Sequence, residues 1–277
     1  MTKPFKMKNP PINEVACGFI FDPIEFSSPF LLTDYFQDKA KEGFNSSRIV
    51  DPIIEQTVGI NFQIRGPSGN ALPFRIWLEN PETGFLIQIQ SDRFYLNWKR
   101  KTSASKYPYF CRPNGIQEIA IREFEYFQNF IQRQLSIKPN CNRVNLTNVD
   151  IFDRNTAHDG LTQFAELMPM LQSLAEVQST GSSQESDACN INIGFNEADG
   201  KSKLSLSLTS GFLIAPPNQH KPIYKLETVI NTQRPDETDL QNTLHSNHIR
   251  LRELFFALLK ESTAISMFGM ENEEAAP

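Results

Sequence analysis

The feature that most constrains the fold is an apolar stripe with helical spacing between Gly115 and Leu135. Apolar residues recur there at steps of three or four, and this spacing predicts a long helix with one apolar face. The stripe consists of Ile116, Ala120, Phe124, Phe127, Ile131 and Leu135. A helix of this kind must bury its apolar face, and several segments before it alternate apolar and polar residues as strands do. We therefore expect the helix to lie across a sheet.

The clearest of these strands is Arg93 to Trp98. Its alternation puts Phe94, Leu96 and Trp98 on one face and Tyr95, Asn97 and Lys99 on the other. One apolar face and one polar face are typical of an antiparallel sheet with a solvated side. Further strands are predicted at Glu14–Phe21, Gly59–Ile64, Phe74–Glu79 and Phe85–Gln90, and a helix is predicted from Ser27 or Ser28 to about Glu42.

The second half of the chain repeats this order of elements. It is predicted to contain a strand at Cys141–Phe152, a helix at Leu161–Val177, a hairpin with Asp199-Gly200 in its turn, a strand at Ile223–Thr232 and a helix at about Asp236–Glu261. The sequence thus predicts an α+β fold built by duplication, with two similar halves, each a curved antiparallel sheet with a long helix packed across one face. The N-terminal domain is expected to span residues 1–143 and the C-terminal domain residues 144–277, so that they meet near Asn140 to Asn145.

The composition is that of a globular protein without a membrane anchor. The chain has 277 residues, 39% of them hydrophobic, and a formal net charge of -5. No apolar run approaches the roughly 18 residues that a membrane span needs, and no apolar segment follows the basic N-terminus. We expect a cytoplasmic protein. The polar tract Gln178–Asp187 is predicted to be a mobile loop, and the acidic end from Glu271 to Pro277 is predicted to be a disordered tail.

Known catalytic and metal-binding patterns are missing from the sequence. It has no P-loop, no Rossmann glycine pattern, no serine nucleophile elbow and no His-Glu-x-x-His zinc motif. Cys17, Cys111, Cys141 and Cys189 are too widely spaced for a zinc site or a disulfide framework, and we expect reduced thiols in the core or in strands. We predict no catalytic residues, no metal site and no cofactor.

Two other groups of residues could bind a metal but also have ordinary structural interpretations. His245 and His248 lie three residues apart on the last predicted helix, a spacing that could serve a metal, but no third ligand is near and His248 falls on the apolar stripe. Asp187, Asp199 and Lys201 resemble the acidic and lysine set of metal-dependent nucleases. Because Asp-Gly is the usual dipeptide of a hairpin turn, a solvated turn is the favoured interpretation of Asp199.

The most suggestive candidate site is a basic and aromatic loop at the end of the Arg93–Trp98 strand. It carries Lys99, Arg100, Lys101, Lys106, Tyr107 and Tyr109. Cations in such a loop could pair with phosphates while a tyrosine ring stacks on a base. The alternative is a solvated loop whose cations protect a sheet edge from aggregation. Trp98 shares a face with Phe94, so we expect it in the core rather than in a binding platform.

Fragments spread over most of the chain carry a family resemblance. They are Pro11-x-x-Glu14-Val15-x-x-Gly18-x-x-Phe21, Gln88-Ile-Gln90-Ser-Asp92-Arg93-Phe94-x-x-Asn97-Trp98-Lys99, Tyr107-Pro108, Phe124, His248, Phe255 and Phe268-Gly269. In these fragments the chain resembles an uncharacterised, sporadically distributed family of bacterial two-domain α+β proteins with no established activity. The chain departs from the family pattern at Phe110, where a Tyr is usual, and at Phe268, where a Trp is usual. The resemblance implies a cytoplasmic protein in two parts, and it brings no catalytic residues with it.

Three functions of different classes are consistent with these patterns. The first is a non-enzymatic interaction or sensing module, an accessory component of a bacterial defence or immunity system, with another protein as partner or a small molecule as ligand. The second is an accessory protein that binds nucleic acid through the basic loop at residues 99–106. The third is a metal-dependent hydrolase, which only the acidic set of Asp187 and Asp199 supports.

Overall fold

The computed structural model describes residues 5–7, 10–26, 29–53, 74–102, 105–153, 168–169, 190–215, 219–235 and 239–272. Its strands are β1 (Phe5–Met7), β2 (Ile12–Phe21), β3 (Ser46–Val50), β4 (Arg75–Glu79), β5 (Phe85–Gln90), β6 (Arg93–Lys99), β7 (Cys141–Asp153), β8 (Asn190–Asn196), β9 (Ser202–Ala215), β10 (Gln219–Gln233) and β11 (Met270–Asn272). Its helices are the 3-10 helix η1 (Pro29–Leu32) and the α-helices α1 (Thr33–Lys41), α2 (Ile116–Leu135), α6 (Leu240–Leu258) and α7 (Glu261–Phe268). The mixed α+β class agrees with the prediction.

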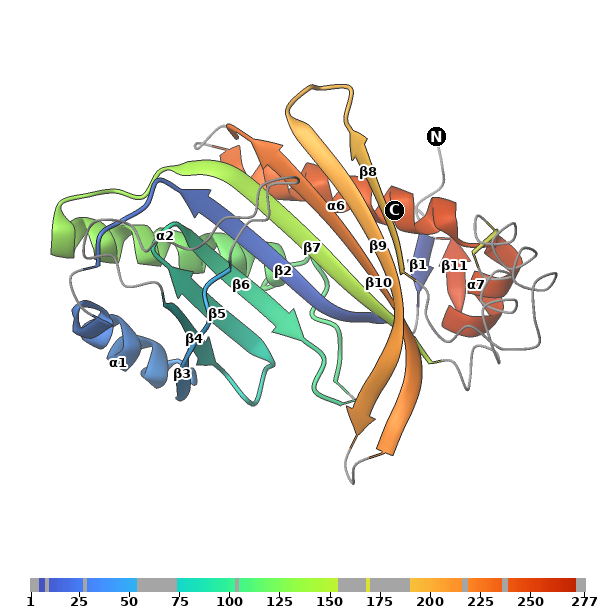
Figure 1. Ribbon diagram of the computed structural model, residues 1–277, viewed down its shortest axis with the longest axis horizontal. Coiled ribbons are helices and arrows are strands. Elements are labelled where there is room, and N and C mark those ends of the chain that lie inside the picture. Colours follow the sequence, from blue (N-terminus) through green and yellow to red (C-terminus); the bar gives the residue numbers. More distant parts are fainter. Residues whose placement is uncertain are drawn as a thin grey trace.

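One antiparallel sheet of nine strands runs through both halves of the chain, in the order β3-β4-β5-β6-β2-β7-β10-β9-β8 (Figure 1). The halves join where β2 pairs with β7, in a register that includes Cys17 opposite Leu146 and Phe19 opposite Val144. The prediction of a separate sheet in each half is therefore corrected. The predicted boundary after residue 143 lies inside β7, which is paired along both of its edges. Pairing β2 with β7 satisfies backbone groups that would otherwise form open sheet edges.

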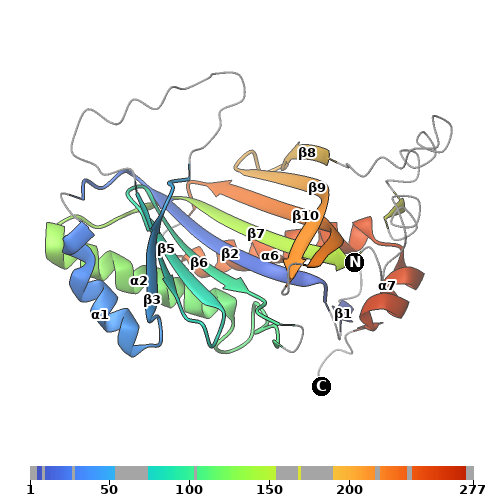
Figure 2. The same ribbon diagram turned by 60° about the horizontal axis from the view of Figure 1, so that its bottom comes forward.

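Both long helices cover the same face of this sheet (Figures 1 and 2). Helix α2 packs on β2 and β6, helix α6 packs on β7 and β10, and the two helices contact each other. The long helix predicted from Gly115 to Leu135 is confirmed as α2. The last helix, predicted from Asp236 to about Glu261, is confirmed as α6, and the extended residue Leu259 follows its end and precedes the short helix α7.

Aromatic residues form the core between α2 and the sheet. The ring of Phe19 stacks on Phe124 with 4.3 Å between centroids. The ring of Phe127 lies 5.2 Å from Phe94 and 6.0 Å from Tyr35, and all five side chains are fully buried. The alternation predicted for β6 is also confirmed, since Phe94, Leu96 and Trp98 face this core.

Helix α1 is tied to α2 by a buried ion pair. The Lys39 ammonium lies 2.6 Å from the Glu123 carboxylate, and only 2% of each side chain is exposed. The same ammonium lies 4.1 Å from the ring centroid of Tyr126. A charge buried this deeply needs a partner, so the pair fixes where α1 sits against α2.

Several other sequence predictions are corrected by the structure or lie outside the described residues. The chain at residues 270–272 forms β11 and pairs with β1, so the predicted disordered tail is wrong for Glu271 and Asn272. Phe255 of the last helix, expected to be buried against the sheet, is only half-buried. Cys111, expected in the core or in a strand, is exposed. The predicted strand Gly59–Ile64, helix Leu161–Val177, loop Gln178–Asp187 and Cys189 lie outside the described residues, as do residues 273–277.

Truncation of Phe127 tests the core between α2 and the sheet. We expect Phe127→Ala to lower the free energy of unfolding by about 3 to 5 kcal/mol, because it removes a fully packed ring and leaves a cavity. Ile137→Ala, a truncation at a half-exposed position just after α2, should change it by less than about 0.5 kcal/mol. Urea unfolding measures both values. Equal, small effects of the two variants would contradict the described packing.

Candidate functional site

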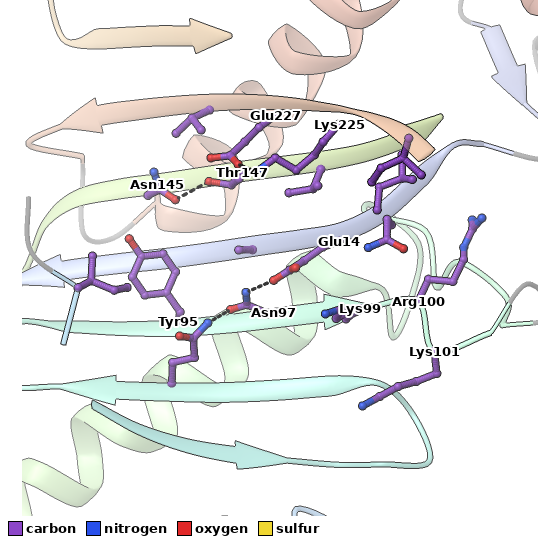
Figure 3. Close-up of a pocket in the computed structure, with 18 of the residues that line it drawn as sticks. Glu14, Tyr95, Asn97, Lys99, Arg100, Lys101, Asn145, Thr147, Lys225 and Glu227 are labelled. Carbon is purple, nitrogen blue, oxygen red and sulfur yellow. Dashed lines mark hydrogen bonds and ion pairs between the residues drawn. The ribbon is translucent and has the colours of Figure 1, made fainter. Parts of the chain in front are cut away.

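The face of the sheet opposite the helices carries a large hollow, which we call the sheet hollow (Figure 3). Its volume is about 960 Å³, and its lining comes from β2, β5, β6, β7, β10 and the segments beside them. The labelled side chains in Figure 3 are Glu14, Tyr95, Asn97, Lys99, Arg100, Lys101, Asn145, Thr147, Lys225 and Glu227. Along each strand these residues alternate with core residues, so they stand on the uncovered face.

A chain of hydrogen bonds crosses four strands in the floor of the hollow. Arg75 Nη1 donates to Gln88 Oε1 at 3.1 Å, and Gln88 Nε2 donates to Asn97 Oδ1 at 2.7 Å. Asn97 Nδ2 then donates to Glu14 Oε1 at 2.6 Å. Gln88 and Asn97 are only 6% and 5% exposed. Because each amide both donates and accepts, their orientations are fixed before any partner arrives.

A second set of polar contacts continues on the strands of the other half. Thr147 Oγ1 donates to Asn145 Oδ1 and Asn145 Nδ2 donates to Asn231 Oδ1, each at 3.0 Å. On the same face, the Lys225 ammonium pairs with Glu227 at 3.0 Å. The polar surface therefore runs across the junction of β2 and β7 and belongs to both halves.

The Tyr95 ring lies across β2 because residue 18 is a glycine. A Cβ atom at Gly18 would stand 2.2 Å from Tyr95 Cε1, closer than any real contact. The missing side chain lets the ring lie against the backbone and form a wall of the hollow instead of filling it (Figure 3).

The three predicted cations at the end of β6 lie at the rim of the sheet hollow (Figure 3). Lys99 is exposed. Arg100 is half-buried, and its Nη2 donates to the Pro10 carbonyl at 3.1 Å. Lys101 forms an ion pair with Glu79. Of the three cations, Lys99 is thus the most accessible to a ligand.

The remaining predicted site residues do not join these cations. Lys106 is exposed and lines neither of the two cavities described here. Tyr107 packs edge-on against Trp98 at 5.4 Å, and Tyr109 lies 5.6 Å from Tyr107. Both tyrosines line a second cavity on the helix side of the sheet. Of the six predicted residues, three therefore lie at the sheet hollow, two line the second cavity, and Lys106 belongs to neither.

This second cavity, which we call the α6 cavity, has a volume of about 410 Å³. It lies between α6, the end of β7 and the segment from Tyr107 to Arg112. Its lining is Met7, Pro10, Pro11, Ile12, Tyr107, Tyr109, Phe110, Cys111, Arg112, Asn148, Asp150, His245, His248, Ile249, Arg252, Phe255 and Phe256. Gly115 lets this segment pack closely against the start of α2. A Cβ atom at this position would lie 2.6 Å from the carbonyl oxygens of Tyr109 and Arg112.

Two titratable groups in the α6 cavity have strongly shifted pKa values. Burial raises the pKa of Asp150 to about 7, although the positive charge of Arg100 opposes the shift. Burial lowers the pKa of His248 to about 4, with Arg252 and His245 adding to the effect. The His248 ring stacks on Phe110 with 4.3 Å between centroids, and its Nδ1 has no hydrogen-bond partner. His248 is therefore uncharged at physiological pH, whereas the pKa of Asp150 lies within the physiological range, so that its carboxylate form is accessible there.

The weaker constellations from the sequence have structural roles among the described residues. His245 Nδ1 lies 3.2 Å from the Cys111 sulfur, and no group of three or more His, Cys, Asp or Glu side chains that could hold a metal occurs in the described part of the chain. Asp199 is confirmed in a hairpin turn, where its Oδ1 accepts from the backbone N–H groups of Lys201 and Ser202 at 2.8 Å. Asp187 lies outside the described residues.

Sequence reasoning missed most residues of both cavities. Glu14, Gln88 and Asn97 appear in the sequence only as polar positions of amphipathic strands. What distinguishes these positions in the sequence is that they carry an acid and two amides, whereas lysines are usual on a face that is only solvated. Asp150 carried a clearer signal, because with Asn148 it interrupts the apolar pattern of Val144, Leu146 and Phe152 on the core-facing side of the strand.

Comparison with protein-family models, with curated proteins and with solved structures found no match to this chain. Among the described residues, no helix is long and apolar enough to cross a membrane.

Substitution of Asp150 tests its burial through the pH dependence of stability. The carboxyl is protonated in both the folded and the unfolded chain below about pH 4. As pH rises from about 4 to 7, the unfolded chain loses its proton first, so the free energy of unfolding falls and the full penalty applies above about pH 7. Asp150→Asn removes this penalty. We expect the variant to be more stable than the wild type at pH 8, by up to about 4 kcal/mol, and equally stable near pH 4.

The measurement is urea unfolding of both proteins across this pH range. His248 shifts stability in the opposite direction in both proteins, so its effect cancels in the difference. Glu125→Gln, at an exposed position of α2, is the matched control and should show no such pH-dependent difference. A stability difference for Asp150→Asn that does not vary with pH would show that the carboxyl is solvated.

Proposed function

We propose that the protein is a non-enzymatic binding module that uses the sheet hollow to recognise a polar partner. The observation that carries this proposal is a hydrogen-bonded polar hollow on a sheet face that no described helix covers. Such a surface offers many oriented donors and acceptors, and their fixed geometry lowers the entropic cost of binding. Amide side chains dominate the floor of the hollow, and amides do not serve as general acids or bases.

A protein partner fits the size and chemistry of this surface best. The hollow extends over five neighbouring strands, which corresponds to a width of roughly 19 Å at about 4.8 Å per strand. Apolar side chains, among them Val149, Ile151 and Val229, lie between the polar groups. A mixture of apolar and polar side chains of this kind is usual in a protein interface. An accessory role in bacterial defence stays a prediction from the family resemblance.

The strand order supports the predicted duplication. In the first half, β2 lies innermost and pairs with the last strand, β6, before the long helix α2 begins. In the second half, β7 lies innermost and pairs with the last strand, β10, before the long helix α6 begins. We infer that the two halves arose from one unit and that the sheet hollow formed at their junction.

Photo-crosslinking from within the hollow tests the proposed function. A photoreactive benzoylphenylalanine replaces Val149, which lines the hollow and makes no side-chain hydrogen bond. Gln134 on the exposed side of α2 carries it in the matched control. In cells of the host bacterium we expect a discrete protein adduct from position 149 and none from position 134. Identical adducts from the two positions, or none from position 149, would contradict the proposal.

Nucleic acid is the second candidate partner of the same hollow. Lys99, Arg100 and Lys101 at its rim could contact phosphates, and the Tyr95 ring could stack on a base (Figure 3). The negative net charge of the chain and the pairing of Lys101 with Glu79 weaken this alternative. In the crosslinking experiment it predicts an adduct that nuclease digestion removes, whereas an adduct with a protein partner withstands nuclease.

The salt dependence of oligonucleotide binding tests this alternative directly. If the rim contacts phosphates, the double variant Lys99→Ala and Lys101→Ala should reduce the slope of log K against log salt by roughly 1 to 2, since each phosphate contributes about 0.7 on a single strand. Fluorescence anisotropy with a labelled oligothymidylate measures the slope. The control, Lys138→Ala with Lys260→Ala, removes the same charge from exposed positions outside the hollow. Equal slopes for the two double variants, or no binding by the wild type at low salt, would exclude the rim as a phosphate site.

A further inference from the structure

The α6 cavity contains buried polar groups that the fold itself leaves without partners. Asp150 is 5% exposed, and no hydrogen bond or ion pair to its carboxyl occurs among the described residues. Two residues earlier on β7, Asn148 Oδ1 is buried with no hydrogen-bond partner in the described part of the chain, and so is Nδ1 of His248 on α6. Each such group destabilises the fold unless something satisfies it. Three of them lining one cavity point to a ligand that supplies hydrogen-bond donors.

The walls of the cavity are flat and aromatic. The rings of Phe110 and His248 stack on each other, with 4.3 Å between centroids and an interplanar angle of 9°, and Tyr107, Tyr109, Phe255 and Phe256 also line the cavity. A volume of about 410 Å³ lies in the range of small-molecule sites. These walls suit a planar ring system, which gains apolar contact area without loss of internal freedom.

The mouth of the cavity is positively charged. Arg112 is exposed, and its guanidinium carbon lies 4.0 Å from the ring centroid of Tyr109. Arg252 is half-buried and close enough to His248 to influence its titration. Neither arginine forms an ion pair with an acidic side chain among the described residues. Arginines placed in this way fit a phosphate group.

From this juxtaposition we propose that the α6 cavity binds a guanine nucleotide, with the base against the aromatic walls and the phosphate at Arg112 and Arg252. Guanine carries a ring N–H next to an exocyclic amino group, so one carboxylate can accept both hydrogen bonds in a bidentate arrangement. Adenine and cytosine present an acceptor nitrogen beside their amino group, which would face the Asp150 carboxylate unfavourably. This site lies on the helix side of the sheet and rests on no part of the proposed function.

Calorimetric titration with GMP, AMP and guanosine tests the proposal. The wild type should bind GMP at least about tenfold more tightly than AMP, and Asp150→Asn should weaken GMP binding by at least about tenfold, since it removes one of two charge-assisted acceptors. Arg112→Ala should weaken GMP binding but leave guanosine binding unchanged, because the nucleoside has no phosphate. Glu125→Gln, which removes an acidic group outside the cavity, should bind GMP like the wild type.

Urea unfolding of each variant separates lost binding from lost folding. Arg112 is exposed, so its truncation should leave stability unchanged and keeps the test valid even if Asp150→Asn perturbs the cavity. The proposal is overturned if the wild type binds no GMP, if AMP binds as tightly as GMP, or if GMP binding survives Asp150→Asn. Equal loss of GMP and guanosine binding in Arg112→Ala would overturn the placement of the phosphate.

Discussion

The pairing of β2 with β7 is the contact on which the rest of the structure depends. It joins the innermost strand of each half and thereby makes one sheet of nine strands out of the strands of both halves. Because both strands put their apolar side chains on the same side, α2 and α6 must cover the same face and contact each other. The opposite face is then left to polar side chains from both halves. A junction through loops or helices would have left two separate surfaces, whereas the strand pairing makes one continuous polar surface.

The polar face is ordered because its side chains satisfy one another. Gln88 and Asn97 are nearly as buried as core residues, and they would destabilise the sheet if their amides were unpaired. The hydrogen bonds from Arg75 through Gln88 and Asn97 to Glu14 prevent this and fix the shape of the surface. The α6 cavity represents the opposite case. Asp150 and His248 face apolar walls without partners there, so the same fold contains one polar site that is satisfied internally and one that is not.

Much of the local structure could be predicted from the sequence, because it follows from side-chain periodicity. The stripe on α2 and the alternation on β6 are decided by nearest neighbours along the chain, and both are confirmed. The single sheet could not be predicted, since strand order depends on contacts between residues more than one hundred positions apart, such as Cys17 and Leu146. The division of the predicted site residues between two faces of the sheet could not be predicted for a related reason. Lys99 and Tyr107 are neighbours in sequence, but the chain passes from one side of the sheet to the other between them, and only the fold reveals this.

The two cavities lie back to back across one layer of the sheet. Successive residues of β7 alternate between them, because Thr147 and Val149 line the sheet hollow while Asn148 and Asp150 line the α6 cavity. The segment after β6 also serves both, with Arg100 at the rim of the hollow and Tyr107 in the wall of the cavity. Arg100 also favours the charged form of Asp150, and its guanidinium donates to the carbonyl of Pro10, a residue that lines the α6 cavity. Arg100 is therefore a residue of the hollow's rim whose charge acts on a titratable group of the other cavity. The strand that joins the two halves thus supplies side chains to both cavities, and a substitution on β7 changes one cavity or the other according to the face on which it lies.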